Sequence, residues 1–317
     1  MMEATSIGAS GGGRPSLESP GSRRGEKAIK GLLALCGLLS VVTTTAIVIA
    51  LIGPTISFFG EVSFGEFFST GWFPTFNPPT FGVFDIVVGT LNVTLWGMVF
   101  AIPIGLGAAI YLAEYASPRV RKVVKPILEI LAGIPTVAIG FFAVSFLLPI
   151  IQDVWPGDFL GGADKPFLAI AAGLGIGLMI VPIIASISED AMSAVPQGLR
   201  EGAYAMGATK AKVATRVVFP AALSGIVASI VLGISRAVGE TMIVVLAAGS
   251  TPNATLNPVE SIQAITSFIA VTATGDISQG SITYEAVFAA GTVLFLMTLA
   301  MNVISIRLVR RYREVYE

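Results

Sequence analysis

The chain contains no histidine, one cysteine and few charged residues. Charged residues make up 12% of its 317 positions, whereas a soluble domain carries about 25%. Because histidine is the commonest general base and metal ligand, its absence disfavours catalysis by this chain. Cys36 has no second cysteine with which to form an internal disulfide, so it gives no information about the redox compartment. We expect it to be a small packing residue.

Apolar residues are abundant instead. They make up 54% of the sequence, and the mean hydropathy is +0.83. A membrane-spanning helix needs about 20 apolar residues, because the hydrocarbon core is about 30 Å thick and each residue rises about 1.5 Å. Six stretches are long enough, and the fifth alone contains charged residues. They predict an all-α membrane protein with six transmembrane helices, at residues 31–53, 86–113, 130–152, 167–188, 217–249 and 286–306.

Basic residues gather beside alternate ends of these stretches. Lysine and arginine near helix ends mark the cytoplasmic side of a membrane protein. The connections on the opposite side hold only Lys165, close to three aspartates. We therefore predict that both termini are cytoplasmic. The clustered basic residues are Arg23, Arg24, Lys27, Lys30, Arg119, Arg121, Lys122, Lys125, Arg200, Lys210, Lys212, Arg216, Arg307, Arg310, Arg311 and Arg313.

Composition divides the chain into three parts. Residues 1–26 are rich in glycine, serine and proline, which predicts a disordered cytoplasmic arm. Residues 27–85 hold the first transmembrane helix, too long for a cleaved signal peptide, and an extracytoplasmic segment. That segment is rich in proline and aromatic residues such as Trp72, so we expect an interfacial cap; plain anchoring at the membrane surface is the alternative. Residues 86–317 form the main transmembrane domain.

One polar stretch interrupts the apolar sequence. It lies in the longest predicted cytoplasmic connection, residues 189–216, and reads EGAYAMGATKAKVATRVVFP from Glu201 to Pro220. Its alanine-rich, charged sequence predicts short helices. Gly207 breaks them, because glycine tolerates the positive φ of a turn. Such a segment is suited to docking against another protein, and a solvated amphipathic linker is the alternative.

The spacing in this stretch resembles the EAA loop of permease subunits of ATP-binding-cassette (ABC) importers. Glu201, Gly202 and Ala203 are followed after three residues by Gly207, and after nine more by a Val217–Pro220 segment. Glycine replaces the family's first alanine, and Val217 and Phe219 replace isoleucine and leucine. The resemblance implies a type I ABC importer permease fold, in which residues 189–220 form a coupling helix seated on an ATPase subunit. The coupling residues that it implies are Glu201, Gly202, Ala203, Gly207, Ala208 and Pro220.

Arg236 and Glu240 lie inside the fifth apolar stretch, four residues apart. On one helix they would be neighbours on the same face, and each charge costs about 2.5–3.5 kcal/mol at the centre of a membrane helix if it is unpaired. A mutually neutralising pair that fixes helix packing is one interpretation. The other is that Arg236 receives a transported oxyanion, because its planar fork of donors fits tetrahedral anions. Glu240 would then hold Arg236 between transport cycles.

Other polar residues are weaker candidates for the same pathway. They bond to the backbone or to a neighbouring helix more often than they line a path. These candidates are Ser235, Thr90, Asn92, Thr94 and Thr136.

A wider resemblance covers the chain from about residue 81 onward. The segments FGVFDIVVGTLNVT, AIPIGLGAAIYLAEYA, LEILAGIPTVAIGFFA and SRAVGETM resemble permeases of the phosphate-specific importer. The N-terminal arm, first helix and outer segment look more like the PstC-type subunit than its PstA-type partner. In that family the residues matching Arg236 and Glu240 are regarded as transport residues.

The resemblance implies the partners of this chain. They are a second permease of the PstA type, two ATP-binding subunits of the PstB type and an extracytoplasmic binding protein of the PstS type, in a bacterial inner membrane. No G-x-x-x-x-G-K-[ST] phosphate loop occurs here, so we expect ATP and magnesium on the partner ATPase and no cofactor on this chain. We expect membrane lipid and no nucleic acid as further partners.

Three other functions remain open. They are import of another oxyanion such as molybdate or sulfate, ion-coupled secondary transport with Glu240 as proton relay, and a membrane receptor or scaffold.

Overall fold

The computed structural model describes residues 23–312 and divides the chain into two compact units, Met1–Ala50 and Leu51–Glu317. The described part of the first unit is the beginning of helix α1 (Arg23–Glu61), and most apolar side chains of this part are exposed. Residues 23–26 of the predicted arm are thus helical, and the rest of the arm lies outside the described residues. The side chains of Arg310, Arg311 and Arg313 also lie outside them.

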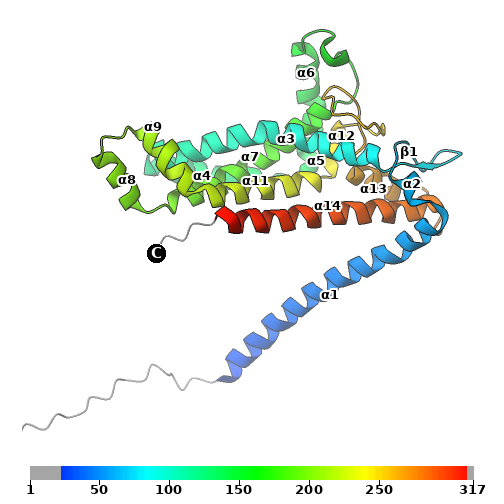
Figure 1. The fold of residues 1–317 in the computed structure, drawn as a ribbon, viewed down its shortest axis with the longest axis horizontal. Helices are drawn as coiled ribbons and strands as arrows, with labels where there is room; N and C mark the ends of the chain where they lie inside the picture. The colour runs from blue at the N-terminus through cyan, green and yellow to red at the C-terminus, as the bar shows by residue number, and fades with distance from the viewer. Residues whose placement is uncertain (1–22, 313–317) are drawn as a thin grey trace, which may run out of the picture. The chain divides into compact units, whose positions relative to one another are not determined.

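The second unit is helical, apart from one small hairpin (Figure 1). Among residues 23–312, five helices are long and apolar enough to cross a membrane, or six if a bent pair, Lys210–Ala221 with Leu223–Val238, counts as one span. This agrees with the predicted all-α class. The elements are α2 (Phe64–Phe67), β1 (Trp72–Phe73), β2 (Thr80–Phe81), α3 (Phe84–Ile110), η1 (Tyr111–Tyr115), α4 (Pro118–Ala132), α5 (Thr136–Phe142), η2 (Ala143–Leu147), α6 (Leu148–Val154), η3 (Phe159–Gly161), α7 (Ala169–Ser193), α8 (Gln197–Ala205), α9 (Lys210–Val213), η4 (Ala214–Val218), α10 (Phe219–Ala221), α11 (Leu223–Val238), α12 (Met242–Ala247), α13 (Ile265–Thr274) and α14 (Ile282–Tyr312).

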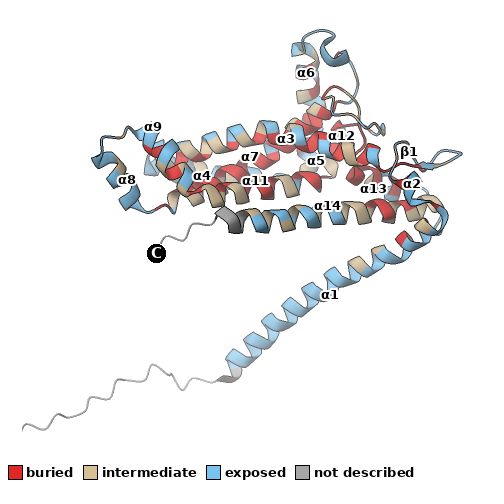
Figure 2. Cartoon of the chain, in the orientation of Figure 1, coloured by how far each residue is buried: buried red, intermediate tan, exposed pale blue. Residues whose placement is uncertain are grey.

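Helices α3 and α7 form the centre of this unit, and α7 is the most buried of the long helices (Figure 2). Glycines line their contact. A Cβ atom built on Gly177 would lie 2.9 Å from the carbonyl oxygen of Gly97, and one on Gly173 would lie 2.8 Å from Cβ of Trp96. Small residues allow membrane helices to approach closely, so that dispersion contacts replace the weak hydrophobic drive available in lipid.

The segment after α1 packs onto the end of the bundle opposite α8 and α9 (Figure 1). Trp72 is only 1% exposed and its ring stands edge-on against Phe268 of α13, with 5.0 Å between ring centroids. Asp85 accepts hydrogen bonds from the backbone amides of Gly71 and Trp72. Trp72 is therefore a core residue of the protein, whereas Phe76 is exposed.

The third predicted span does not form one continuous helix. Helix α4 ends at Ala132, and α5 begins at Thr136 after Pro135 in an extended conformation. Proline disfavours helical geometry in the residue before it, which explains the break. The candidate span therefore begins at Thr136 and runs to Val154, not from 130 to 152.

The fifth predicted span, residues 217–249, is also broken. Near Pro220 the chain bends by 72°, where proline cannot donate the amide hydrogen bond that a straight helix requires. Helix α11 then ends at Val238, and α12 begins at Met242. The prediction of one continuous helix is therefore wrong, because the chain breaks both before and after α11.

Replacing Gly177 by alanine tests the α3–α7 contact. We expect a loss of about 1–3 kcal/mol, the usual cost of overpacking, because the new methyl group would meet the backbone of α3. The measurement is thermal unfolding of the purified protein in detergent. Gly107→Ala on α3 is the matched control, since nothing lies within 4 Å of its Cβ position; an equal melting temperature for both variants would contradict the prediction.

Candidate functional site

Gly207 ends helix α8 with the hydrogen bonds of a Schellman motif. Its φ is +76°; its amide donates to the carbonyl of Tyr204, and the amide of Ala208 donates to that of Ala203. These bonds satisfy carbonyls that the helix end would leave unpaired, and they need a left-handed residue at this position. The predicted break at Gly207 is confirmed.

The polar stretch presents one side to the protein and the other to solvent. Ala203 and Ala208 pack against a cluster that contains Met192 and Ile226. Glu201, Gly202, Gly207 and Pro220 are exposed. At the turn, Met206 is 87% exposed, an unusual degree for a large apolar side chain.

An ion pair attaches α8 to the end of α3. Nε and Nη2 of Arg200 lie 3.2 and 3.0 Å from Oε1 of Glu114 in η1. The Arg200 side chain is 12% exposed and that of Glu114 is 4% exposed. On the other side of Gly207, Nζ of Lys210 lies 5.0 Å from the ring centroid of Tyr115, as a cation–π contact.

Helix α4 is attached to the end of α7 by charges. Glu189, fully buried, pairs with Arg121 and Lys125, and Lys125 also pairs with Asp190. Burial lowers the pKa of Lys125, but its hydrogen bonds and charge interactions with the two carboxylates outweigh burial and raise that pKa. The stabilisation is therefore fully present at neutral pH and is lost only as pH rises through the raised pKa.

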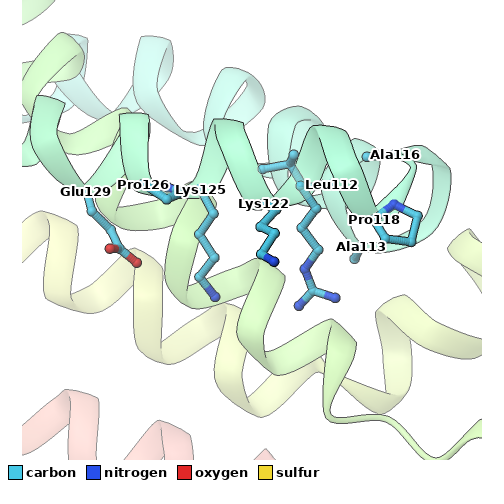
Figure 3. A pocket seen from close by; sticks show the side chains of 9 residues that line it. Leu112, Ala113, Ala116, Pro118, Lys122, Lys125, Pro126 and Glu129 are labelled. Carbon is cyan, nitrogen blue, oxygen red and sulfur yellow. The ribbon is translucent and has the colours of Figure 1, made fainter.

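A cavity of about 470 Å³ lies along the basic side of α4. Lys122, Lys125 and Glu129 project from the helix in the same direction there (Figure 3). The opposite side of α4 exposes Val123 and Ile127. The helix is thus amphipathic, with its charges facing the cavity.

Arg236 and Glu240 do not share a helix. Arg236 occupies the last turn of α11 and is exposed. Glu240 is 8% exposed, and its Oε1 accepts hydrogen bonds from the amides of Met242 and Ile243 at the start of α12. Among the described residues, no ion pair or hydrogen bond joins the two side chains. Each charge lies instead at the helix end whose dipole favours it.

The prediction that Arg236 and Glu240 are i, i+4 neighbours on one helix face is therefore wrong. The helix stops between the two residues, because the Glu240 side chain satisfies α12 amides and Oγ1 of Thr266 donates to the Glu240 carbonyl at 2.7 Å. In this conformation Glu240 does not hold Arg236. Ser235 lies 3.4 Å from Oδ1 of Asn302, and Thr136 begins α5, partly exposed.

The polar residues of α3 bond to the backbone. Oγ1 of Thr90 donates to Ile86 and accepts from the amide of Ile265, and Thr94 donates to Thr90. Asn92 donates to two carbonyls of the loop after α12, while its buried Oδ1 has no partner. The bonds of Asn92 and Thr90 hold this loop and α13 on α3, which agrees with the alternative that these polar residues bond to the backbone.

Comparison with known families decides the class of protein. Residues 101–314 match the model of the binding-protein-dependent transport system inner membrane component. The chain belongs to this family. It is a multi-pass membrane permease of a bacterial ABC importer, a non-catalytic subunit that acts with an ATPase and a binding protein.

Several curated relatives of the permease are similar over most of its length. The probable ABC transporter permease protein YqgH of Bacillus subtilis is 33% identical, over 84% of this chain and 85% of the relative. The phosphate transport system permease protein PstC of Pasteurella multocida is 33% identical, over 80% and 83%. PstC of Haemophilus influenzae is 30% identical, over 91% and 94%.

Solved structures share the fold of the permease. A bacterial ABC transporter that imports alginate has a TM-score of 0.61 at 18% identity, over 92% of this chain and all of that chain. The inward-facing MetNI methionine ABC transporter has a TM-score of 0.53 at 19% identity, over 73% and 94%. These similarities show that the chain has the fold of ABC importer permeases.

Some residues of the site escape prediction from sequence. Arg200 counts in the sequence only as one of several basic residues, and Glu114 lies 86 positions away at the end of an apolar stretch. No local pattern links them. The exposure of Met206 was not predicted, because the sequence contains many apolar residues. Its position directly before Gly207, at a turn, is the one signal that could have indicated it.

Replacing Glu240 by alanine tests its role at the start of α12. We expect a loss of about 0.5–2 kcal/mol, as for other helix-capping residues, because two amides lose their acceptor. The measurement is the melting temperature of the purified permease. Glu240→Gln keeps an acceptor oxygen and serves as the control; if both variants melted together below the wild type, the negative charge and not the cap would be responsible.

Proposed function

We propose that this permease forms half of the membrane channel of an ATP-driven importer of inorganic phosphate. One observation carries the proposal: Arg236 is an exposed cation at a helix break within the apolar bundle, with its neighbour Glu240 engaged elsewhere. A guanidinium group stays protonated and presents a planar fork of donors that suits tetrahedral oxyanions. Curated relatives that carry the name PstC support phosphate as the oxyanion.

The proposed mechanism assigns separate tasks to the two ends of the bundle. A PstS-type binding protein delivers phosphate at the end that holds β1 and α13. Two PstB-type ATPase subunits, which carry ATP and magnesium, press on the loop around Gly207 here and on its counterpart in a PstA-type permease. The helices then rock, phosphate passes Arg236, and hydrolysis resets the channel.

Charge placement supports a cytoplasmic position for the C-terminus and for the loop around Gly207. Arg200, Lys210 and Lys212 belong to α8 and α9, and Arg307 lies near the end of α14, which runs toward the same end of the bundle (Figure 1). Basic residues on one side of a membrane protein mark its cytoplasmic side. The loop is thereby accessible to an ATPase.

Arg236→Ala is the sharpest test of the proposed pathway. We expect ATP-dependent phosphate uptake into proteoliposomes to be abolished, because the anion loses its cationic partner, while the subunits still copurify. Arg119→Ala, which removes an exposed arginine from α4, is the matched control and should transport normally. Uptake by Arg236→Ala at the wild-type rate would refute the proposal.

The same assay separates the other functions. Uptake of molybdate or sulfate instead of phosphate by the wild-type complex would assign a different oxyanion. Uptake by this chain without an ATPase would establish a secondary carrier, and the absence of any uptake by the complete complex would favour a receptor or scaffold.

Met206→Glu tests the docking of the loop. We expect weaker copurification of the ATPase, because a charged side chain would replace the exposed apolar one that we propose docks in a groove of the ATPase. The fold should not change, since the side chain is 87% exposed. Met206→Leu keeps an apolar group and should retain binding. Wild-type copurification by Met206→Glu would contradict docking at this turn.

A further inference from the structure

The Arg200–Glu114 ion pair is more buried than most charge pairs in the described part of the chain. Its side chains are 12% and 4% exposed, whereas the Lys165–Glu260 pair, at 2.6 Å, is 35% and 31% exposed. Exposed pairs contribute little to stability because water screens them. A buried pair resists separation, because removing one partner leaves an uncompensated charge in a poorly solvated site.

Arg200 contacts two helices at once. Besides Glu114, its guanidinium donates to the carbonyl of Met192 at 2.8 Å and to that of Val195. Met192 belongs to the last turn of α7, and η1 continues α3. One side chain of α8 thus joins the ends of the two helices that form the centre of the bundle.

The loop is held on both sides of its exposed turn. Arg200 precedes Gly207 and Lys210 follows it, and they contact the adjacent residues Glu114 and Tyr115. A polar cavity of about 500 Å³ adjoins both contacts and is lined by Glu114, Arg200 and Lys210 themselves. The turn is thus attached to η1 by an ion pair on one side and by a cation–π contact on the other.

We propose that Arg200 and Glu114 are positioning residues that make α3 and α7 move with the loop when the ATPase displaces it. The pair does not contact the transported anion. Its task is to keep the loop and the helix ends at fixed distances, so that ATP hydrolysis is converted into movement of the channel. This proposal rests on the proposed function, since it requires an ATPase that acts on the loop.

Glu114→Gln in the complete reconstituted complex tests the proposal. The complex contains both permeases, the ATPase and the binding protein, and the measured quantity is ATP hydrolysed per anion imported. We expect the subunits to copurify and hydrolysis to continue while import falls, so that the ratio rises several-fold. Arg200→Lys keeps the charge but loses the fork that reaches the carbonyls of Met192 and Val195, so it should give an intermediate ratio.

Glu260→Gln is the matched control, since it removes one carboxylate from an ion pair near the start of α7, away from the loop. Its ratio should equal that of the wild type. If Glu114→Gln fails to assemble, a double Glu114→Gln, Arg200→Gln variant, which leaves no uncompensated charge, carries the test.

The outcomes separate the two proposals. An unchanged ratio in an assembled variant, or a parallel fall of hydrolysis and import, would overturn the linking role, as would failure of both the single and the double variant to assemble. A wild-type complex that imports an anion other than phosphate would refute the proposed cargo only, because the ratio is then measured with that anion.

Discussion

The close approach of α3 and α7 is the constraint on which the other features depend. A Cβ atom on Gly177 would lie 2.9 Å from the carbonyl oxygen of Gly97, too close to fit without a shift, and one on Gly97 would lie 3.1 Å from the carbonyl oxygen of Gly173. Lipid gives little hydrophobic drive for helices to associate, so close contact and dispersion hold the two helices together. Once they are fixed, their ends define the frame to which α4, α8 and the loop after α12 attach through polar side chains.

Charge is used sparingly and at helix ends. Glu189 at the end of α7 receives Arg121 and Lys125 from α4, and Glu240 receives the first amides of α12. Arg236 occupies the last turn of α11. Placing each charge where a helix dipole or a counter-charge compensates it lowers the cost of a polar group in an apolar bundle. The same placement leaves Arg236 exposed and free of Glu240.

Long apolar runs predict where the helices lie but not where they break. The runs continue across Pro135 and Gly239, because both sides of each break remain in an apolar environment, so hydropathy alone predicts one helix where the structure has two. The break at Gly207 was predictable, since a left-handed residue after an alanine-rich helix is a local signature. The Arg200–Glu114 pair was not, because its partners come from distant segments and meet only after α3 and α7 have packed.

Local sequence signatures and contacts between distant segments serve different purposes in the molecule. Local signatures such as the Schellman turn at Gly207 create a surface that another protein can engage, and they need little tertiary support. Transmission of movement needs contacts between distant segments, because a turn that moved alone would leave the helices in place. The loop satisfies both requirements: Met206 stands out in solvent, while Arg200 is buried against two helix ends.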